Sequence, residues 1–336
     1  MVGPFSSPTF SFPTSDYCIL TTGYLSSYPY AAKVSMRTSV PEMKLVPAND
    51  LPLLEKAAGL ASAAGLELYA VGGCARDWAR GCESADIDFL LSGEAMPVVE
   101  GMEKEYGGRH QKFTPFLTVR FFSSEGRRLD FARFRRETYA KPAALPAVSA
   151  AASAEEDLKR RDFSCNAMAV RLDGPEAFRL IDPYKGLEDI KSGWVRVLHE
   201  KSFEDDPTRI FRAARFCGRF GWRLEAGTLR LALAAVGAGF PGLLSRERLR
   251  NELVKILGET DPLPALEILR ELGALGFIHP SFVFDQSVAR RGGARERIAA
   301  LAVLMGPAAG EFLAGLRFSK KETMEILRLS TGLRRG

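Results

Sequence analysis

The chain has 336 residues, an apolar fraction of 46% and a formal net charge of +5. This length allows two or three small domains with a buried core, and the slight excess of Lys and Arg permits an anionic partner without requiring one. The five cysteines include no CxxC pair, which argues against a disulfide framework and a zinc site. Because no run of about 18 apolar residues is evident, we expect a cytoplasmic protein without a membrane partner.

Residues 1–44 differ from the rest of the sequence. They are rich in Ser, Thr, Pro and Tyr and nearly uncharged, and they show neither helical periodicity nor the pattern of a signal peptide. A transit peptide fits poorly, because only Lys33 and Arg37 are basic within residues 1–42. We expect a disordered extension or a start codon called too early, with Met43 as the true start.

Helix and strand patterns alternate from residue 45 onward. Apolar residues at helical spacing predict a helix that begins at Leu51 and ends near Gly65, and residues 66–71 alternate as a strand. The next predictions are a helix over 74–80, strands over 87–91, 118–122 and 128–134, and a flexible Ala/Pro/Ser-rich loop over 140–154. From about residue 190 the strands stop, and helical periodicity covers 205–220, 229–236, 247–257 and 263–272. The sequence therefore predicts an α+β chain, with a mixed head followed by an all-helical remainder.

Two aspartates, Asp86 and Asp88, stand two residues apart at the second predicted strand. Side chains at this spacing point to the same side of a strand, so both carboxylates could hold divalent cations such as Mg²⁺. Asp130 could add a third carboxylate. Two metal ions could activate a ribose hydroxyl and neutralise a departing pyrophosphate. Taken alone, such a pair is more often two solvated loop acids.

A glycine pair, Gly72-Gly73, separates the first predicted strand from the next helix. Backbone N–H groups in such a turn form a concavity that suits phosphate oxygens, and Arg76 on the first helical turn could add bidentate contacts. A tight turn alone would explain the two glycines, but it would leave Arg76 and the aspartates unexplained.

Two later segments combine arginines with acids. Arg160 and Arg161 beside Asp162 could bind a triphosphate and ribose hydroxyls, although a helix start with local ion pairs explains this segment better when it is taken alone. Asp206 and Arg209 are three apart on a predicted helix, where a carboxylate and a guanidinium on one face could read a base edge without a template. An intrahelical salt bridge is the alternative for that pair.

The order of these motifs resembles class II tRNA nucleotidyltransferases and bacterial poly(A) polymerases, from about residue 45 to the C-terminus. The matching segments are Gly72-Gly73-x-x-Arg76-Asp77 with Asp86-x-Asp88, Arg160-Arg161-Asp162-Phe163 with Asn166-Ala167, Asp182-Pro183-Tyr184-x-Gly186, Asp205-Asp206-Pro207-x-Arg209, and Ser245-x-Glu247-Arg248-x-Arg250-x-Glu252-Leu253. The resemblance implies a DNA polymerase beta superfamily head over 45–189 and a base-recognising helical neck over 190–258. It also implies an RNA-binding helical body over 259–336 that lacks the tail of longer relatives.

The same resemblance implies roles for individual residues. Asp86 and Asp88, with Asp130, would be catalytic, and Asp86 and Asp88 would hold Mg²⁺. The nucleotide would be bound by Gly72, Gly73, Arg76, Arg160, Arg161, Asp162, Asn166, Asp205, Asp206, Arg209 and Arg212. A flexible element near 135–155 corresponds to one that the family uses to switch between C and A addition.

The expected reaction is template-independent addition of CMP and AMP from CTP and ATP to the 3′ end of a tRNA, which completes or repairs CCA with release of pyrophosphate. The alternatives are CC-only addition, A-only addition, poly(A) synthesis and a non-catalytic RNA-binding protein. The intact Asp86 and Asp88 count against the last. The chain departs from the family in having Asp205-Asp206 where a Glu-Asp pair is usual, and in its Ala-rich loop. The sequence carries no signal for an oligomeric state.

Overall fold

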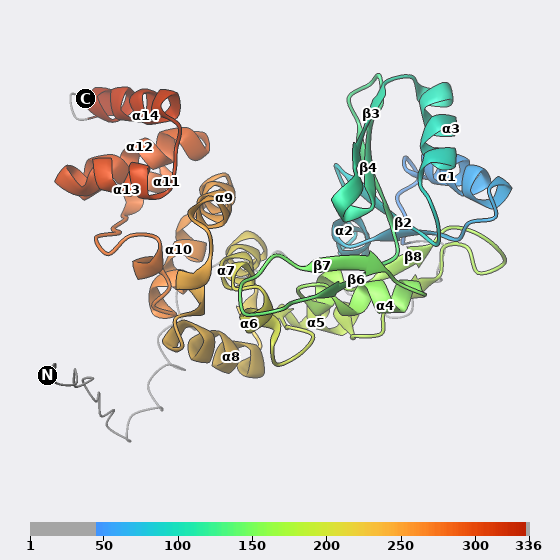
Figure 1. Cartoon of the computed structure of the whole chain (residues 1–336), viewed down its shortest axis with the longest axis horizontal. Helices are drawn as coiled ribbons and strands as arrows, with labels where there is room; N and C mark the ends of the chain where they lie inside the picture. Colours follow the sequence, from blue (N-terminus) through green and yellow to red (C-terminus); the bar gives the residue numbers. More distant parts are fainter. Residues whose placement is uncertain (1–44, 334–336) are drawn as a thin grey trace, which may run out of the picture. The chain divides into compact units, whose positions relative to one another are not determined.

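The computed structural model describes residues 45–333 (Figure 1). The expectations for residues 1–44 and for Cys18 lie outside the described residues. Cys74, Cys82, Cys165 and Cys217 are free thiols. The α+β prediction is confirmed, because a mixed sheet with helices precedes a mainly helical part.

A seven-stranded mixed sheet occupies the first part of the described chain. Its strand order is β3-β4-β5-β2-β1-β8-β9. The strands are β1 (Leu68–Val71), β2 (Ile87–Leu91), β3 (Arg109–Phe113), β4 (Thr118–Phe122), β5 (Arg128–Arg133), β8 (Ala169–Arg171) and β9 (Leu180–Ile181). β2 and β5 run parallel, whereas the other neighbours in this sheet are antiparallel. The strands predicted at 87–91 and 118–122 are confirmed at both ends.

The two faces of this sheet differ in what they carry. Helices α1 (Leu51–Ala63), α2 (Gly73–Ala79) and α3 (Met96–Tyr106) pack on one face. Ile87, Phe89 and Leu91 of β2 point to that apolar face, so the alternation of a strand places Asp88 on the opposite one. Because Asp88 and Asp130 are register partners in the parallel strands β2 and β5, their side chains lie next to each other there.

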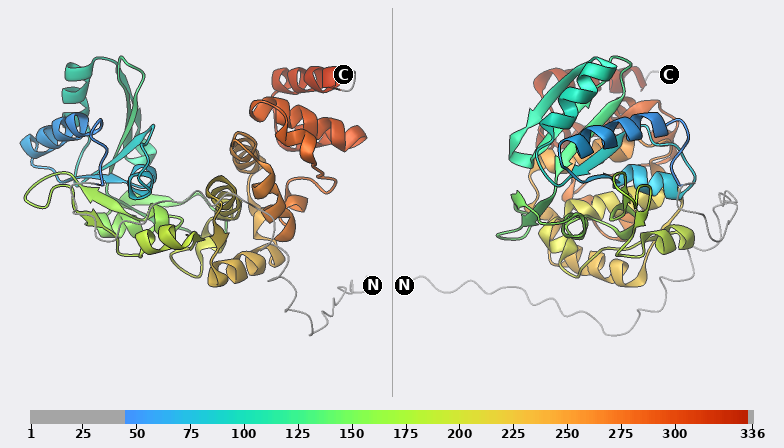
Figure 2. Two further views of the ribbon diagram at one scale, coloured as in Figure 1. Left: turned by 180° about the vertical axis from the view of Figure 1, so that it is seen from behind. Right: turned by 90° about the vertical axis from the view of Figure 1, so that its right-hand side faces the viewer.

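Apolar side chains of the helical part form a second core. Its helices are α6 (Ser202–Asp205), α7 (Thr208–Phe220), α8 (Ala226–Gly237), α9 (Arg246–Leu257), α10 (Leu263–Glu271), α11 (Gln286–Ala289), α12 (Gly293–Met305), α13 (Ala309–Gly315) and α14 (Lys320–Leu333). The preceding helix α5 (Gly186–Ser192) packs instead against the core of the sheet. α7 packs against α9 and α10, and α12 packs against α9 and α14 (Figure 2).

The helix predicted over 205–220 is interrupted. α6 ends at Asp205, Asp206 has an extended backbone, and α7 begins at Thr208. Pro207 explains the break, because its ring disfavours a helical conformation at the preceding residue and it has no N–H to continue the helix.

Two further predictions need correction. The segment predicted as a loop over 140–154 contains β7 (Ala147–Ala150), which pairs with β6 (Arg135–Thr138) in a separate two-stranded sheet. Strands also continue past residue 190, since β10 (Trp194–Val195) and β11 (Arg223–Leu224) form a short parallel pair. Short strands of this kind carry too few residues to show an alternating pattern.

A small apolar cluster joins segments on both sides of residue 190. It contains Phe163, Cys165, Val195, Ala213, Phe216 and Cys217. A backbone hydrogen bond of 2.9 Å from Ser164 N to Arg196 O runs beside it. The two-residue pairing of β10 with β11 closes the same region.

The stretch Gly293–Gly315 is long and apolar enough to cross a membrane by length and composition alone. Its side chains belong to the helical core, where Leu301 and Phe312 are fully buried. The stretch also changes direction at Gly306, which has a φ of 56°. Packing of a protein core therefore accounts for its hydrophobicity.

Candidate functional site

A cleft of about 820 Å³ gathers most of the residues that the sequence singles out. Side chains from β1, β2 and β5 line one part of it, and side chains from α7 and α9 line another. The predicted residues in the cleft are Gly72, Gly73, Arg76, Asp88, Asp130, Arg160, Arg161, Asp162, Asn166, Asp206, Arg209 and Arg212. The structure does not bring Asp86 and Asp205 into the lining. Asp86 precedes β2 with a side chain that is 46% exposed, and Asp205 is the last residue of α6.

The carboxylates at the sheet end of the cleft are held by arginines. Both oxygens of Asp130 accept hydrogen bonds from Arg120, at 2.7 and 2.9 Å. Arg128 pairs with Asp86. Burial raises the pKa of Asp88, the charges of Asp130 and Asp86 raise it further, and those of Arg161 and Arg128 oppose this rise. Asp88 is thus a half-buried acid that has two other carboxylates nearby.

This donor set fits a hard divalent cation. As the side chains of residues 45–333 stand, no three Asp, Glu, His or Cys groups are placed to hold a metal ion, since Arg120 and Arg128 occupy two of the acids. Asp88 and Asp130 nevertheless lie on neighbouring strands with the same face orientation, and carboxylate oxygens are the ligands that Mg²⁺ prefers. A cation there would relieve the repulsion around Asp88.

The glycine turn lies directly under an arginine. Gly72 has a φ of 71°, and a Cβ at this position would stand 2.7 Å from Nη1 of Arg161 and 3.8 Å from Oδ2 of Asp88. The positive φ therefore favours glycine at this position, and any Cβ there would also displace the Arg161 guanidinium. Arg161 itself is anchored by a hydrogen bond of 3.1 Å to the buried Asp157. The turn, Arg161 and Asp88 consequently form one side of the cleft.

A chain of hydrogen bonds connects α2 with α7. Arg76 Nη1 donates to Asn166 Oδ1 at 2.7 Å, and Asn166 Nδ2 donates to Asp162 Oδ1 at 3.0 Å. Arg212 Nε donates to Asp162 Oδ2 at 2.9 Å. Asp162 is central to this chain, because it accepts from both sides.

We expect this chain of hydrogen bonds to make the folded state sensitive to acid. Burial alone would raise the pKa of Asp162, but the charge of Arg212 and the hydrogen bonds from Asn166 and Arg212 lower it to about 2, against an ordinary value of 3.8. A lowered pKa in the folded state stabilises the protein at pH values above the ordinary one. We therefore expect the unfolding free energy to fall by about 2 kcal/mol as the pH drops from about 4 toward 2. Urea unfolding followed across this range measures the effect, and a pH-independent free energy there would contradict it.

The predicted base-reading pair lies differently from the expectation. Asp206 precedes α7, and its Oδ1 accepts from Thr208 N at 3.0 Å and from Arg248 Nη2 at 2.6 Å. Asp206 and Arg209 therefore do not share a helix face. Asp206 pairs with Arg248, so the intrahelical salt bridge is not formed either. Arg209 is buried and donates to the Ser202 hydroxyl at 2.7 Å and to a backbone carbonyl at 2.8 Å.

The sequence did not predict a row of three aromatic rings that contact arginine side chains. Phe216, Phe220 and Trp222 stack in succession, with ring centroids 5.9 and 4.6 Å apart. The guanidinium carbons of Arg76, on α2, and of Arg80, which directly follows α2, lie 4.9 and 4.2 Å from the Phe220 centroid. Such cation–π contacts hold α2 against α7. The spacing of four residues between Phe216 and Phe220 was the feature of the sequence that could have predicted this row.

Other cleft residues were also missed. They are Arg128, Arg135, Glu137, Tyr139, Thr208, Arg215, Arg219, Arg248, Asn251, Glu252 and Lys255. Several come from β6 and from α9, whose motif over 245–253 was recognised without a role. Periodicity identifies α9 as a helix, but it does not reveal which of its polar faces turns toward a cleft.

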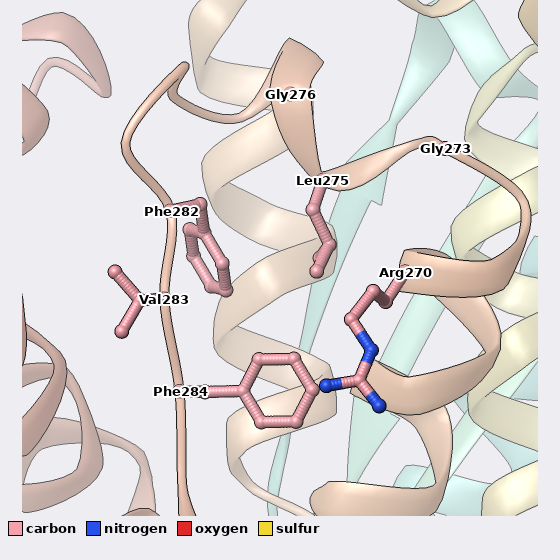
Figure 3. Close-up of a pocket in the computed structure, with 7 residues that line it drawn as sticks. All are labelled: Arg270, Gly273, Leu275, Gly276, Phe282, Val283 and Phe284. Carbon is pink, nitrogen blue, oxygen red and sulfur yellow. The ribbon is translucent and has the colours of Figure 1, made fainter.

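A second hollow of about 320 Å³ lies where α10 is followed by the segment over 282–284 (Figure 3). Phe282 and Phe284 line it, and the Arg270 guanidinium carbon lies 5.4 Å from the Phe284 ring centroid. Arg270 is already paired with Glu267. None of the acids and phosphate-binding groups predicted from the sequence lines this hollow, so we assign the functional site to the larger cleft.

Two sequence profiles match the chain. One is described as "Poly A polymerase head domain" and matches residues 68–196. The other is described as "Probable RNA and SrmB- binding site of polymerase A" and matches residues 243–284. The first profile contains the aspartates and the glycine turn of the cleft, and the second contains most of α9.

Relatives and a solved structure resemble the chain along much of its length. An A-adding tRNA nucleotidyltransferase of Halalkalibacterium halodurans is 39% identical over 227 residues, which are 67% of this chain and 53% of that protein. A multifunctional CCA protein of Nitrosococcus oceani is 35% identical over 222 residues, 64% of this chain and 50% of that protein. A crystal structure of a tRNA nucleotidyltransferase with a primer tRNA and an incoming ATP analog is 32% identical, with a TM-score of 0.61 over 82% of this chain and 75% of the other. The chain thus spans about half the length of the two curated relatives.

Proposed function

This chain belongs to the family of class II tRNA nucleotidyltransferases and poly(A) polymerases, and from this premise we propose that it adds nucleotides to the 3′ end of a tRNA. The observation that supports the proposal most strongly is the juxtaposition of Asp88 and Asp130 in a cleft with the Gly72 turn and many arginines. Enzymes with a head domain of this family generally use a divalent metal. A chain that only bound RNA would have no need to bury an acid among like charges.

We assign the metal to the carboxylates at the sheet end of the cleft. Asp86 and Asp88, with Asp130, would hold Mg²⁺ once Arg128 releases Asp86. The metal, when bound, stabilises negative charge on a transferring phosphoryl group. The chain's own groups then bind the triphosphate at the Gly72–Gly73 turn and orient it by Arg161 and other guanidinium groups of the cleft.

The base and the sugar would be bound at the α7 side of the cleft. Asp162 and Asn166 offer hydrogen-bonding groups near the glycine turn, and Asp206 and Arg209 lie at the start of α7. Each of these residues already has an internal partner, since Asn166 donates to Asp162, Asp206 accepts from Thr208 and Arg209 donates to Ser202. Nucleotide binding would therefore exchange internal hydrogen bonds for bonds to the ligand, rather than fill unpartnered groups at these four positions.

The end product divides the proposal in two. The resemblance in sequence favours complete CCA addition from CTP and ATP, and the relative from N. oceani is named a multifunctional CCA protein. The higher identity to an A-adding enzyme, 39% against 35%, supports addition of AMP alone as the second candidate. We place the enzyme in the cytoplasm, consistent with the free cysteines Cys74, Cys82, Cys165 and Cys217.

The test is incorporation of labelled CTP and ATP, separately and together, into tRNAs that end before CCA, after the first C and after CC, with Mg²⁺. We expect addition that depends on the metal and stops at the completed end. Ordered addition of C, C and A would establish the CCA-adding function, and addition of a single A to the CC end would establish the A-adding one. A folded chain that incorporates neither nucleotide into any of the three RNAs would overturn the proposal.

A further inference from the structure

Glu252 on α9 is a buried acid with an unused oxygen in the cleft wall. Its side chain is 7% exposed, and Oε1 accepts from Lys255 Nζ at 2.6 Å. Oε2 is buried and has no hydrogen-bond partner within the described part of the chain. Leaving a buried acceptor without a donor costs about 1–3 kcal/mol, so a donor that enters the cleft would be bound favourably.

Arg215 on α7 has a donor nitrogen without a partner in the part of the chain that the structure describes. It lines the same cleft as Glu252, and the charges of the two side chains interact. One guanidinium nitrogen pairs with Glu259 at 3.2 Å, but Nε is buried without an acceptor among residues 45–333. Two side chains that line one cleft from neighbouring helices therefore hold an unused acceptor and an unused donor.

Glu252 itself is not placed to bind a phosphate. Arg219, Arg248 and Lys255 supply positive charge to this part of the cleft, and any of them suits a phosphate. A carboxylate repels phosphate, whereas it accepts hydrogen bonds from an amino group. Glu252 thus indicates a neutral ligand edge that carries an amino donor.

Nucleobases divide by the exocyclic group at C4 of a pyrimidine or C6 of a purine. At that position of the pairing edge, cytosine and adenine present an amino donor beside a ring nitrogen acceptor. Uracil and guanine present a carbonyl acceptor beside a ring N–H donor, although guanine also carries an amino group at C2. An acceptor held opposite the exocyclic group and a donor held opposite the ring nitrogen would therefore favour cytosine and adenine over the other two bases.

We propose that Glu252 and Arg215 form a second base-reading pair, which accepts from the amino group and donates to the ring nitrogen of a cytosine or adenine. This inference rests on the proposed nucleotidyl transfer, which brings two bases into the cleft. The base belongs to the incoming nucleotide or to the last nucleotide of the RNA. The carboxylate of a glutamate turns easily about its last torsion, so Oε2 can reach a ligand without movement of α9.

The experiment compares the full chain with its Glu252→Gln variant in two arms. The first arm measures kcat/KM for CTP, ATP, UTP and GTP on one RNA, and the second uses one nucleotide on RNAs that end in C or in U. We expect the preference for the amino-bearing base to fall about tenfold in one arm, because one hydrogen bond is replaced by a repulsive contact. The arm that responds identifies the base that Glu252 reads. If the Gln variant does not fold, Glu252→Asp is the second variant. It keeps the negative charge but moves the carboxylate oxygens away from the base, so the same fall in base preference is expected.

Glu247→Gln is the matched control. Glu247 is on the same helix and pairs with Arg317 outside the cleft lining, so both preferences should stay unchanged. Unchanged preferences in Glu252→Gln, or an equal loss of kcat/KM for every base in both arms, would overturn the inference by leaving Glu252 a purely structural role. A wild-type chain that incorporates nothing would instead remove the proposed function on which the inference rests.

Discussion

Substitution of Asp88 by Asn is expected to reduce nucleotide incorporation at least about a thousandfold. The carboxylate lies beside Asp130 at the sheet end of the cleft, and Asn is a much poorer ligand for Mg²⁺. Losing the metal would remove several kcal/mol of charge stabilisation in the transition state, and each 1.36 kcal/mol is about tenfold in rate. Incorporation of labelled nucleotide into a tRNA lacking its 3′ end measures the effect.

The Asp88→Asn variant should be as stable as the wild type or more stable, although its activity falls. Burial raises the pKa of Asp88, so its negative charge opposes folding at neutral pH, and a neutral Asn should unfold at the same urea concentration or a higher one. Glu94→Gln is the control, because Glu94 is an exposed acid that pairs only at the surface with Arg133. Incorporation within tenfold of wild type in Asp88→Asn would show that Asp88 does not hold the metal.

Substitution of Asp162 by Asn is expected to lower the unfolding free energy by about 3–5 kcal/mol. The change removes the carboxylate partner of Arg212, on α7, within a buried hydrogen-bond network around Asp162, and loss of such a network is among the costlier single substitutions. The Arg212 side chain is 29% exposed, so water compensates part of the lost charge pairing and places the effect at the lower end of this range. It also weakens the hydrogen bonds that connect α2 with α7 through Asn166. Urea unfolding at neutral pH measures the loss.

Two controls separate this effect from a general loss of surface charge. Glu176→Gln breaks an exposed pair with Arg179 and should change the free energy by no more than about 0.5 kcal/mol. Asp162→Asn combined with Arg212→Met should recover part of the loss, because the unpaired charge is gone. The acid-dependent drop in stability below about pH 4 should shrink in Asp162→Asn. A free-energy change below about 1 kcal/mol would show that the Asp162–Arg212 pair does not stabilise the fold.

Local patterns predicted the first half of the fold well. A short apolar run identified β2 at both ends, and a pair of strand-like segments around a turn identified β4 at both ends. The helical spacing of Leu53, Leu54 and Ala57 identified the buried face of α1. The order of the motifs also placed most candidate residues in one cleft. Such success is expected where one face of an element is buried, because burial imposes a regular spacing.

The remaining features depend on contacts that are distant in sequence. Asp206 could be mistaken for a helical residue until the effect of Pro207 on its backbone is considered. Its true partner Arg248 is 42 residues away, and Arg120 reaches Asp130 only because β4 and β5 pair. Glu252 lay within a recognised motif, but its unused oxygen becomes apparent only when α7 and α9 pack together.

The apolar cluster around Phe163, Val195 and Phe216 limits how such proteins can be recombined. A chimera that joins the head of one relative to the neck of another at residue 190 would divide this cluster and the arginine-bearing row on Phe220 between two parents. The side chains on each side of such a seam would have been selected against different neighbours. An exchange point after β11, which ends at Leu224, keeps both groups of side chains within the segment from one parent. The segment that must be exchanged as a whole is therefore longer than the boundary at 190 suggests.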